Sequence, residues 1–126
     1  QRTRLQAKLV RVILGEIFDV AVDVRVGSPT FGRWTGATLS DANARQMYVP
    51  PGFAHGFAVT SDVAEVEYKC SAFYDPADEI AIRFDDAAIG VEWPAGEPLL
   101  SARDSRAMSL ADASALLPRF PTTTRP

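Results

Sequence analysis

Cysteine and histidine are almost absent from this sequence. Its 126 residues contain one of each, Cys70 and His55. One cysteine cannot form an internal disulfide, and stable sites for first-row metals generally need several histidine, cysteine or carboxylate ligands at matched spacings. The sequence therefore predicts no disulfide framework and no metal or other cofactor. We interpret Cys70 as a small buried residue.

Long apolar runs and an excess of positive charge are also missing. No segment approaches the unbroken apolar length that crosses a bilayer, and the charged first eight residues are unlike a signal peptide. With 13 Lys and Arg against 16 Asp and Glu, the formal net charge is -3, which provides no basic surface for nucleic acid or an anionic membrane. We expect a cytoplasmic protein whose partners are small molecules or other proteins.

What the sequence does contain is a series of short segments rich in β-branched and aromatic residues. They are separated by Gly, Pro, Ser, Asp and Asn, lack helical periodicity, and cover residues 8–14, 17–24, 33–39, 46–49, 56–60 and 63–70. Gly15 and Glu16 can form a tight turn, so the first two segments are predicted to pair as a hairpin. Many short strands without helices between them predict an all-β antiparallel sandwich or barrel, and we prefer a jelly-roll-like barrel.

The composition, with 47% hydrophobic residues, is that of one globular domain, which we expect over residues 1–117. Ser109 is predicted to cap a short C-terminal helix over residues 109–117, with Asp112 three positions further on. Residues 118–126, with three prolines and three threonines, are predicted to be a flexible tail. The strand pattern begins almost at once after Gln1, which favours an origin in a longer protein.

The single histidine lies in the most informative segment, residues 48–57. Two prolines and two glycines shape the backbone there, and such a turn can aim a side chain. His55 is interpreted either as a hydrogen-bonded histidine in a strand beside aromatic neighbours or as a residue that contacts a ligand. Its position in the sequence does not decide between the two.

Two tyrosines offer similar alternatives. Alternation along residues 63–69 places Tyr68 on the same face as Val66, toward the barrel interior, where a tyrosine can pack in the core or donate a proton. Tyr74 follows the end of that strand, before a turn rich in Asp and Pro. There it can stack on a flat ligand or, together with Phe73, simply cover the end of the barrel.

Lys8 shares strand parity with apolar residues, so its charge is expected to face the buried side of the strand. Such a lysine needs a partner, either Asp19 or Asp23 in a structural ion pair or the oxyanion of a reacting ligand. Late in the chain, Arg103 stands beside Asp104, an arrangement that is usually a solvated surface pair.

Taken together, these segments closely resemble the dTDP-4-dehydrorhamnose 3,5-epimerase family. The matched segments stand in the family's order and spacing, extend over about residues 5 to 105, and comprise residues 8–12, 15–23, 28–32, 49–57, 67–70, 73–74, 90–94 and 100–104. The resemblance implies a metal-free cupin-type jelly-roll barrel that is usually a homodimer. It also implies epimerisation at C3 and C5 of dTDP-4-dehydro-6-deoxy-glucose to dTDP-4-dehydro-rhamnose, in dTDP-rhamnose and deoxysugar biosynthesis.

The resemblance further implies roles for individual residues. Tyr68 matches the family's acid, and Asp104 matches the carboxylate that orients the base. Five residues match positions that contact substrate, with Lys8 near the ketone and Tyr74 stacking on the thymine ring; these five are Lys8, His55, Tyr74, Glu79 and Arg103. Arg103 stands where a lysine is common, so its planar guanidinium is expected to contact phosphate with a different geometry.

The family's base histidine belongs to a His-aromatic-Gln triplet, and Gln1 matches its glutamine. The base is therefore expected just before residue 1, and the 126-residue chain alone is expected to be inactive. Two alternatives stay open: a non-catalytic or degenerate barrel that binds a dTDP-sugar, and a relative that epimerises only C3 or only C5.

Overall fold

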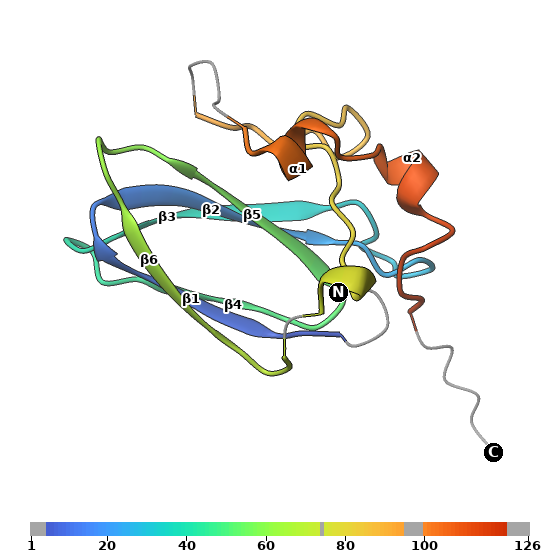
Figure 1. Cartoon of the computed structure of the whole chain (residues 1–126), viewed down its shortest axis with the longest axis horizontal. Helices are drawn as coiled ribbons and strands as arrows, with labels where there is room; N and C mark the ends of the chain where they lie inside the picture. The colour runs from blue at the N-terminus through green and yellow to red at the C-terminus, as the bar shows by residue number, and fades with distance from the viewer. Residues whose placement is uncertain (1–4, 74, 95–99, 121–126) are drawn as a thin grey trace.

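The computed structural model describes residues 5–73, 75–94 and 100–120, apart from the side chains of residues 102 and 103. Within them, six strands form two three-stranded antiparallel sheets that face each other (Figure 1). One sheet has the order β4-β1-β6 and the other β3-β2-β5. The strands are β1 (Lys8–Leu14), β2 (Glu16–Asp23), β3 (Trp34–Ser40), β4 (Gln46–Val49), β5 (Phe53–Val59) and β6 (Glu65–Cys70). The prediction of an all-β architecture is confirmed.

The alternation of side chains along β2 separates two hydrophobic layers. Ile17 and Ala21 point between the sheets and pack with Val10 of β1. Val20 and Val22 point to the opposite face and pack under the C-terminal segment. Because successive side chains of a strand point to opposite faces, β2 is buried on both sides and forms the centre of the molecule.

The predicted hairpin of the first two segments is wrong. β1 pairs with β4 and β6, whereas β2 pairs with β3 and β5, so the chain passes from one sheet to the other at Gly15. Gly15 has φ +85°, and an added Cβ would lie 2.2 Å from the carbonyl oxygen of Val63. Alternation shows which face of a strand is buried, but the neighbouring strand is decided by contacts distant in sequence.

The C-terminal segment covers the outer face of the β3-β2-β5 sheet (Figure 1). It follows a 3-10 turn, η1 (Pro76–Asp78), and includes the short helices α1 (Ala102–Ser105) and α2 (Leu110–Ala113). Ser109 caps α2 as predicted, because its side chain accepts a hydrogen bond from the Asp112 amide, although the helix is shorter than expected. Residues 118–120, which we assigned to the tail, pair with Val26.

Cys70 is exposed rather than buried. It is the last residue of β6 and pairs with Lys8, the first residue of β1, near the end of the sheet. The last three residues of β6 are all exposed, so the burial expected from a cysteine in a strand is lost at this end.

A buried ionic cluster holds the loop that follows β2. Asp23 is 1% exposed and accepts hydrogen bonds from the Arg25 guanidinium, Ser28 and Thr30. Burial alone would raise the pKa of the Asp23 carboxyl, but these hydrogen bonds outweigh burial and hold its pKa well below the usual range. The Arg25 guanidinium also lies 5.0 Å from the ring centroid of Phe53.

We predict that Asp23→Asn lowers the free energy of unfolding by about 3 kcal/mol at neutral pH, because it leaves the Arg25 charge partly buried without its carboxylate. Since the folded-state pKa of Asp23 is depressed, the stabilisation it provides is complete above about pH 4 and is lost as the pH falls. Urea unfolding at several pH values measures both effects. The control is Asp85→Asn, which breaks an exposed pair with Arg83 and is expected to change little. Equal losses in the two variants would contradict the prediction.

Candidate active site

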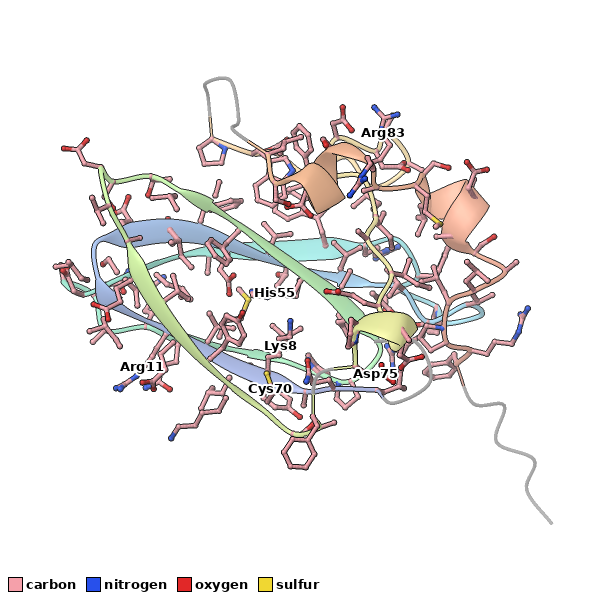
Figure 2. All side chains as sticks on the ribbon, in the orientation of Figure 1. Lys8, Arg11, His55, Cys70, Asp75 and Arg83 are labelled. Atoms are coloured by element: carbon pink, nitrogen blue, oxygen red, sulfur yellow. The ribbon has the colours of Figure 1, made fainter. Side chains whose placement is uncertain are left out.

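Three of the predicted site residues lie together between the two sheets. The ring centroids of His55 and Tyr68 are 6.5 Å apart, and Lys8 Nζ lies 5.4 Å from the centroid of the Tyr68 ring. Figure 2 shows Lys8 and His55 in the space between the sheets, whereas Arg11 projects away from it. The sequence prediction that Lys8 and Tyr68 face the interior is therefore confirmed.

Strand register explains why these residues meet. In the first sheet Tyr68 of β6 is paired with Val10 of β1, so Lys8, two residues before Val10, lies diagonally across on the same face. In the second sheet His55 of β5 is paired with Ala21 of β2, whose side chain belongs to the inner hydrophobic cluster. His55 thus faces the first sheet from the opposite side of the barrel.

His55 is fixed by a buried carboxylate. Its Nε2 lies 2.5 Å from Asp19 Oδ1, and the side chains of His55 and Asp19 are 7% and 0% exposed. The second carboxylate oxygen, Asp19 Oδ2, is the single buried side-chain polar atom without a hydrogen-bond partner among the described residues. Sequence reasoning missed this pairing, since Asp19 was considered only as a partner of Lys8.

Neither predicted carboxylate forms the structural ion pair with Lys8. Asp19 bonds to His55, and Asp23 bonds to Arg25. In the described part of the chain, the contact of the Lys8 ammonium is with the Tyr68 ring, a cation–π arrangement. The Lys8 ammonium therefore lies beside a phenol, and none of the ion pairs between described residues includes it.

The side of the barrel next to Lys8, His55 and Tyr68 is partly open to solvent. Tyr68 is 50% exposed and Phe57, which follows His55 by two residues on the same face of β5, is 41% exposed. Both are large side chains that face the barrel interior, so their exposure means that solvent reaches this space. A phenol, an ammonium and an imidazole at such an opening can donate a proton, stabilise a negative oxygen and hydrogen-bond a polar ligand.

The remaining predicted residues are not joined to this group by a described contact. Glu79 follows η1 and is half-buried, and Asp104 lies exposed in α1. Tyr74 lies outside the described residues, as does the side chain of Arg103. The roles that the resemblance implies for these four residues therefore stay predictions.

Two further features were tested on the residues that the structure covers. They include no cluster of three or more His, Cys, Asp or Glu side chains that could hold a metal ion. None of their helices combines the length and apolar character needed to cross a membrane.

The sequence model of the dTDP-4-dehydrorhamnose 3,5-epimerase family matches residues 1–112 of this chain. The chain belongs to this family. Over 122 residues it is 52% identical to the dTDP-4-dehydrorhamnose 3,5-epimerase of Neisseria gonorrhoeae, a match that covers 96% of this chain. The two-sheet barrel is accordingly the family's cupin-type jelly roll.

Solved structures of the epimerase family superpose closely on this chain. A dTDP-6-deoxy-D-glucose-3,5-epimerase of Legionella pneumophila in complex with dTDP-4-keto-L-rhamnose gives a TM-score of 0.91 at 48% identity, covering 95% of this chain and 65% of that one. A 3'-monoepimerase of Streptomyces bikiniensis in complex with dTDP-quinovose gives 0.86 at 41% identity, covering 90% and 59%. The chain spans 37% to 60% of the length of the first three curated relatives it matches.

We predict that His55→Leu lowers the free energy of unfolding by about 3 kcal/mol, because it leaves the buried Asp19 carboxylate without its partner. The double variant His55→Leu with Asp19→Leu removes both polar groups and is expected to recover much of this loss. Chemical denaturation of the two variants provides the comparison. A double variant that is less stable than His55→Leu would contradict this prediction. It would mean that the unpaired Asp19 carboxylate is not the cause of the loss in His55→Leu.

Proposed function

We propose that this chain forms the substrate pocket of a dTDP-4-dehydrorhamnose 3,5-epimerase, which converts dTDP-4-dehydro-6-deoxy-glucose to dTDP-4-dehydro-rhamnose. The observation that supports it most is the convergence of Lys8, His55 and Tyr68 on one open space inside a barrel of this family. The similarity to an epimerase solved with dTDP-4-keto-L-rhamnose supports the same substrate class.

The chemistry of such a substrate fits these three side chains. The protons at C3 and C5 flank the C4 ketone, so removal of either one gives an enolate whose charge spreads onto the ketone oxygen. An ammonium such as that of Lys8 stabilises this oxygen, and a phenol such as that of Tyr68 returns a proton to the opposite face of the sugar. The configuration at the carbon is then inverted.

In this proposal His55 contacts the sugar and is not the base. The family resemblance already assigns His55 to a substrate-contacting position, so it does not take the role of the base. The base is instead the histidine that the family resemblance places before Gln1, oriented by the Asp104 carboxylate. Glu79, Arg103 and Tyr74 complete the contacts to the substrate in this account, with Tyr74 stacked on the thymine ring.

We predict that Tyr68→Phe in the whole protein lowers the rate of inversion by about 10²- to 10⁴-fold, because the proton donor on one face of the sugar is lost. Exchange of substrate C–H protons in deuterated water is expected to persist, since enolate formation does not require the donor. Proton NMR of the substrate pool measures both quantities.

The control for this experiment is Tyr48→Phe on β4. By strand alternation Tyr48 faces away from the interior, since its neighbours Met47 and Val49 pack against the inner cluster. Inversion at the wild-type rate in Tyr68→Phe would show that Tyr68 is not the donor.

The 126-residue chain alone is predicted to exchange protons far more slowly than the whole protein.

A second candidate function is epimerisation at one centre only. The similarity to a 3'-monoepimerase, at 41% identity, favours keeping it, because small changes in how the sugar is held can decide which proton is removed. The stereochemistry of the product, read by proton NMR, separates the two candidates. Inversion at both C3 and C5 excludes single-centre epimerisation.

We also propose that the protein is a homodimer. Each sheet has two edge strands, β4 and β6 in one and β3 and β5 in the other, and each of the four has one side without a partner strand among the described residues. Light scattering of the whole protein is expected to give twice the mass of one chain, and a monomer mass would contradict the proposal.

A cytoplasmic location stays a prediction.

A further inference from the structure

Residues 118–120 lie along the loop that follows β2, and we call them the strap. The Val26 amide donates a hydrogen bond to the Pro118 carbonyl, and the Phe120 amide donates one to the Val26 carbonyl, both over 2.8 Å. The strap thus forms a short parallel bridge with the loop. It lies beyond residues 1–112, which the family's sequence model matches, so the resemblance implies no role for it.

Arg25, one residue before Val26, contacts two phenylalanine rings from distant parts of the chain. Its Cζ lies 5.0 Å from the ring centroid of Phe53, the first residue of β5, and 5.0 Å from that of Phe120 in the strap. The Arg25 side chain is 26% exposed, and a partly desolvated cation binds an aromatic ring more tightly than an exposed one. Arg25 therefore connects the strap to β5, although no backbone hydrogen bond joins the two in the described part of the chain.

The Arg25 guanidinium is held in one orientation. Its Nε and one Nη donate to the two carboxylate oxygens of Asp23, each over 2.9 Å. Its aliphatic stem lies on Gly52, where an added Cβ would lie 2.6 Å from Arg25 Cγ. A guanidinium bonded through two nitrogens to one carboxylate keeps its plane fixed, and this plane is the surface that the two rings contact. A lysine in its place would keep the charge but not the surface.

Phe53 lies at the end of the barrel that carries Lys8. It shares the inner face of β5 with His55 and packs against the inner hydrophobic cluster. Val49, which pairs with Lys8 in the other sheet, is joined to Phe53 through residues 50–52 alone. The contact with Arg25 therefore holds the start of β5 beside one end of the candidate active site.

The strap is packed loosely against β5. A hollow of about 50 Å³ lies between them, and its lining includes Phe53 and Ala54 of β5 and Pro118 of the strap. Atoms that line an unfilled space lose dispersion contacts, so packing attaches the strap to β5 only weakly. The contact of the Phe120 ring with Arg25 supplies a link that this packing does not.

We propose that Arg25 is a positioning residue, through which the strap holds Phe53, and with it the start of β5, at the substrate end of the barrel. When the strap detaches, the start of β5 loosens and the site binds its ligand less tightly. The effect on the ligand rests on the proposed function. The link from the strap to β5 rests only on the contacts of Arg25.

Amide hydrogen exchange in Phe120→Ala tests this link in the whole protein. Phe120 is 38% exposed, so the variant removes the ring contact and leaves the core intact. The amides of Val24 and Phe53, which donate to carbonyls of the turn before β5, are expected to exchange about tenfold faster. The Thr60 amide, beyond the other end of β5, is expected to keep its wild-type rate. Unchanged exchange at Val24 and Phe53 would overturn the proposal, as would an equal rise at Thr60.

Arg25→Lys tests whether the arginine carries the link. It is expected to speed exchange of the Val24 and Phe53 amides about as much as Phe120→Ala does, because lysine offers no plane for the two rings. Combined with Phe120→Ala it is expected to add little, since both changes break the same connection. Fully additive effects of the two changes would overturn the role of Arg25.

The matched control is Arg83→Lys. The Arg83 guanidinium also donates through two nitrogens to one carboxylate, that of Asp85, but it forms no cation–π contact among the described residues. The substitution there is expected to leave exchange at Val24 and Phe53 at the wild-type rate. A rise equal to that in Arg25→Lys would mean that the ring contacts are not the cause, and it would overturn the proposal.

The coupling must also act in the reverse direction, because a ligand that binds better when the strap is attached holds the strap in place. In the wild type, dTDP-glucose at about a hundred times its dissociation constant is expected to slow exchange of the Val26 amide, which donates to the strap, roughly tenfold. In Arg25→Lys this slowing is expected to be much smaller. Binding of dTDP-glucose without slower exchange at Val26 would overturn the connection between the strap and the site.

These outcomes separate the link from the function on which its effect on the ligand rests. If dTDP-glucose does not bind to the wild type, the proposed function fails, and the effect on the ligand fails with it. Exchange at Val24 and Phe53 without ligand still decides whether Arg25 connects the strap to β5. Faster exchange there in both variants, together with failed binding, would retain the positioning of β5 and reject the ligand.

Discussion

The structure depends on one strand, β2, being buried on both faces. Its even-numbered residues pack under the C-terminal segment, and its odd-numbered residues face the interior of the barrel. An apolar strand would satisfy both layers, but two of the inward positions are aspartates, Asp19 and Asp23, and both are almost completely buried. The burial of these two charges dictates which side chains must lie beside them, because an unpaired carboxylate in this position is strongly unfavourable.

The two aspartates meet this constraint in different ways. Asp23 is surrounded by donors from the loop that follows β2, so it stabilises the fold locally. Asp19 has one donor, and that donor is His55 on the neighbouring strand β5. One aspartate therefore fixes a loop and the other fixes a side chain of the candidate active site, although the two lie only four residues apart on one face of the strand.

Much of the fold could be predicted from the sequence because strand alternation is a local signal. It placed Tyr68 and Lys8 correctly on the inner face, and Ser109 was recognised as a helix cap from its spacing to Asp112. Strand pairing could not be predicted in this way, which is why the first two strands were wrongly joined in a hairpin. The same limit hid the Asp19–His55 pair, whose members are 36 residues apart and meet only through the pairing of β2 with β5.

We propose that the space bounded by Lys8, His55 and Tyr68 holds the sugar of a dTDP-linked substrate. A crystal structure of the whole protein with dTDP-glucose tests this claim most directly. We expect sugar oxygens within hydrogen-bond distance of the Tyr68 hydroxyl and of the His55 ring, with Lys8 Nζ beside C4. A sugar bound outside this space, with Lys8, His55 and Tyr68 free of contact, would contradict it.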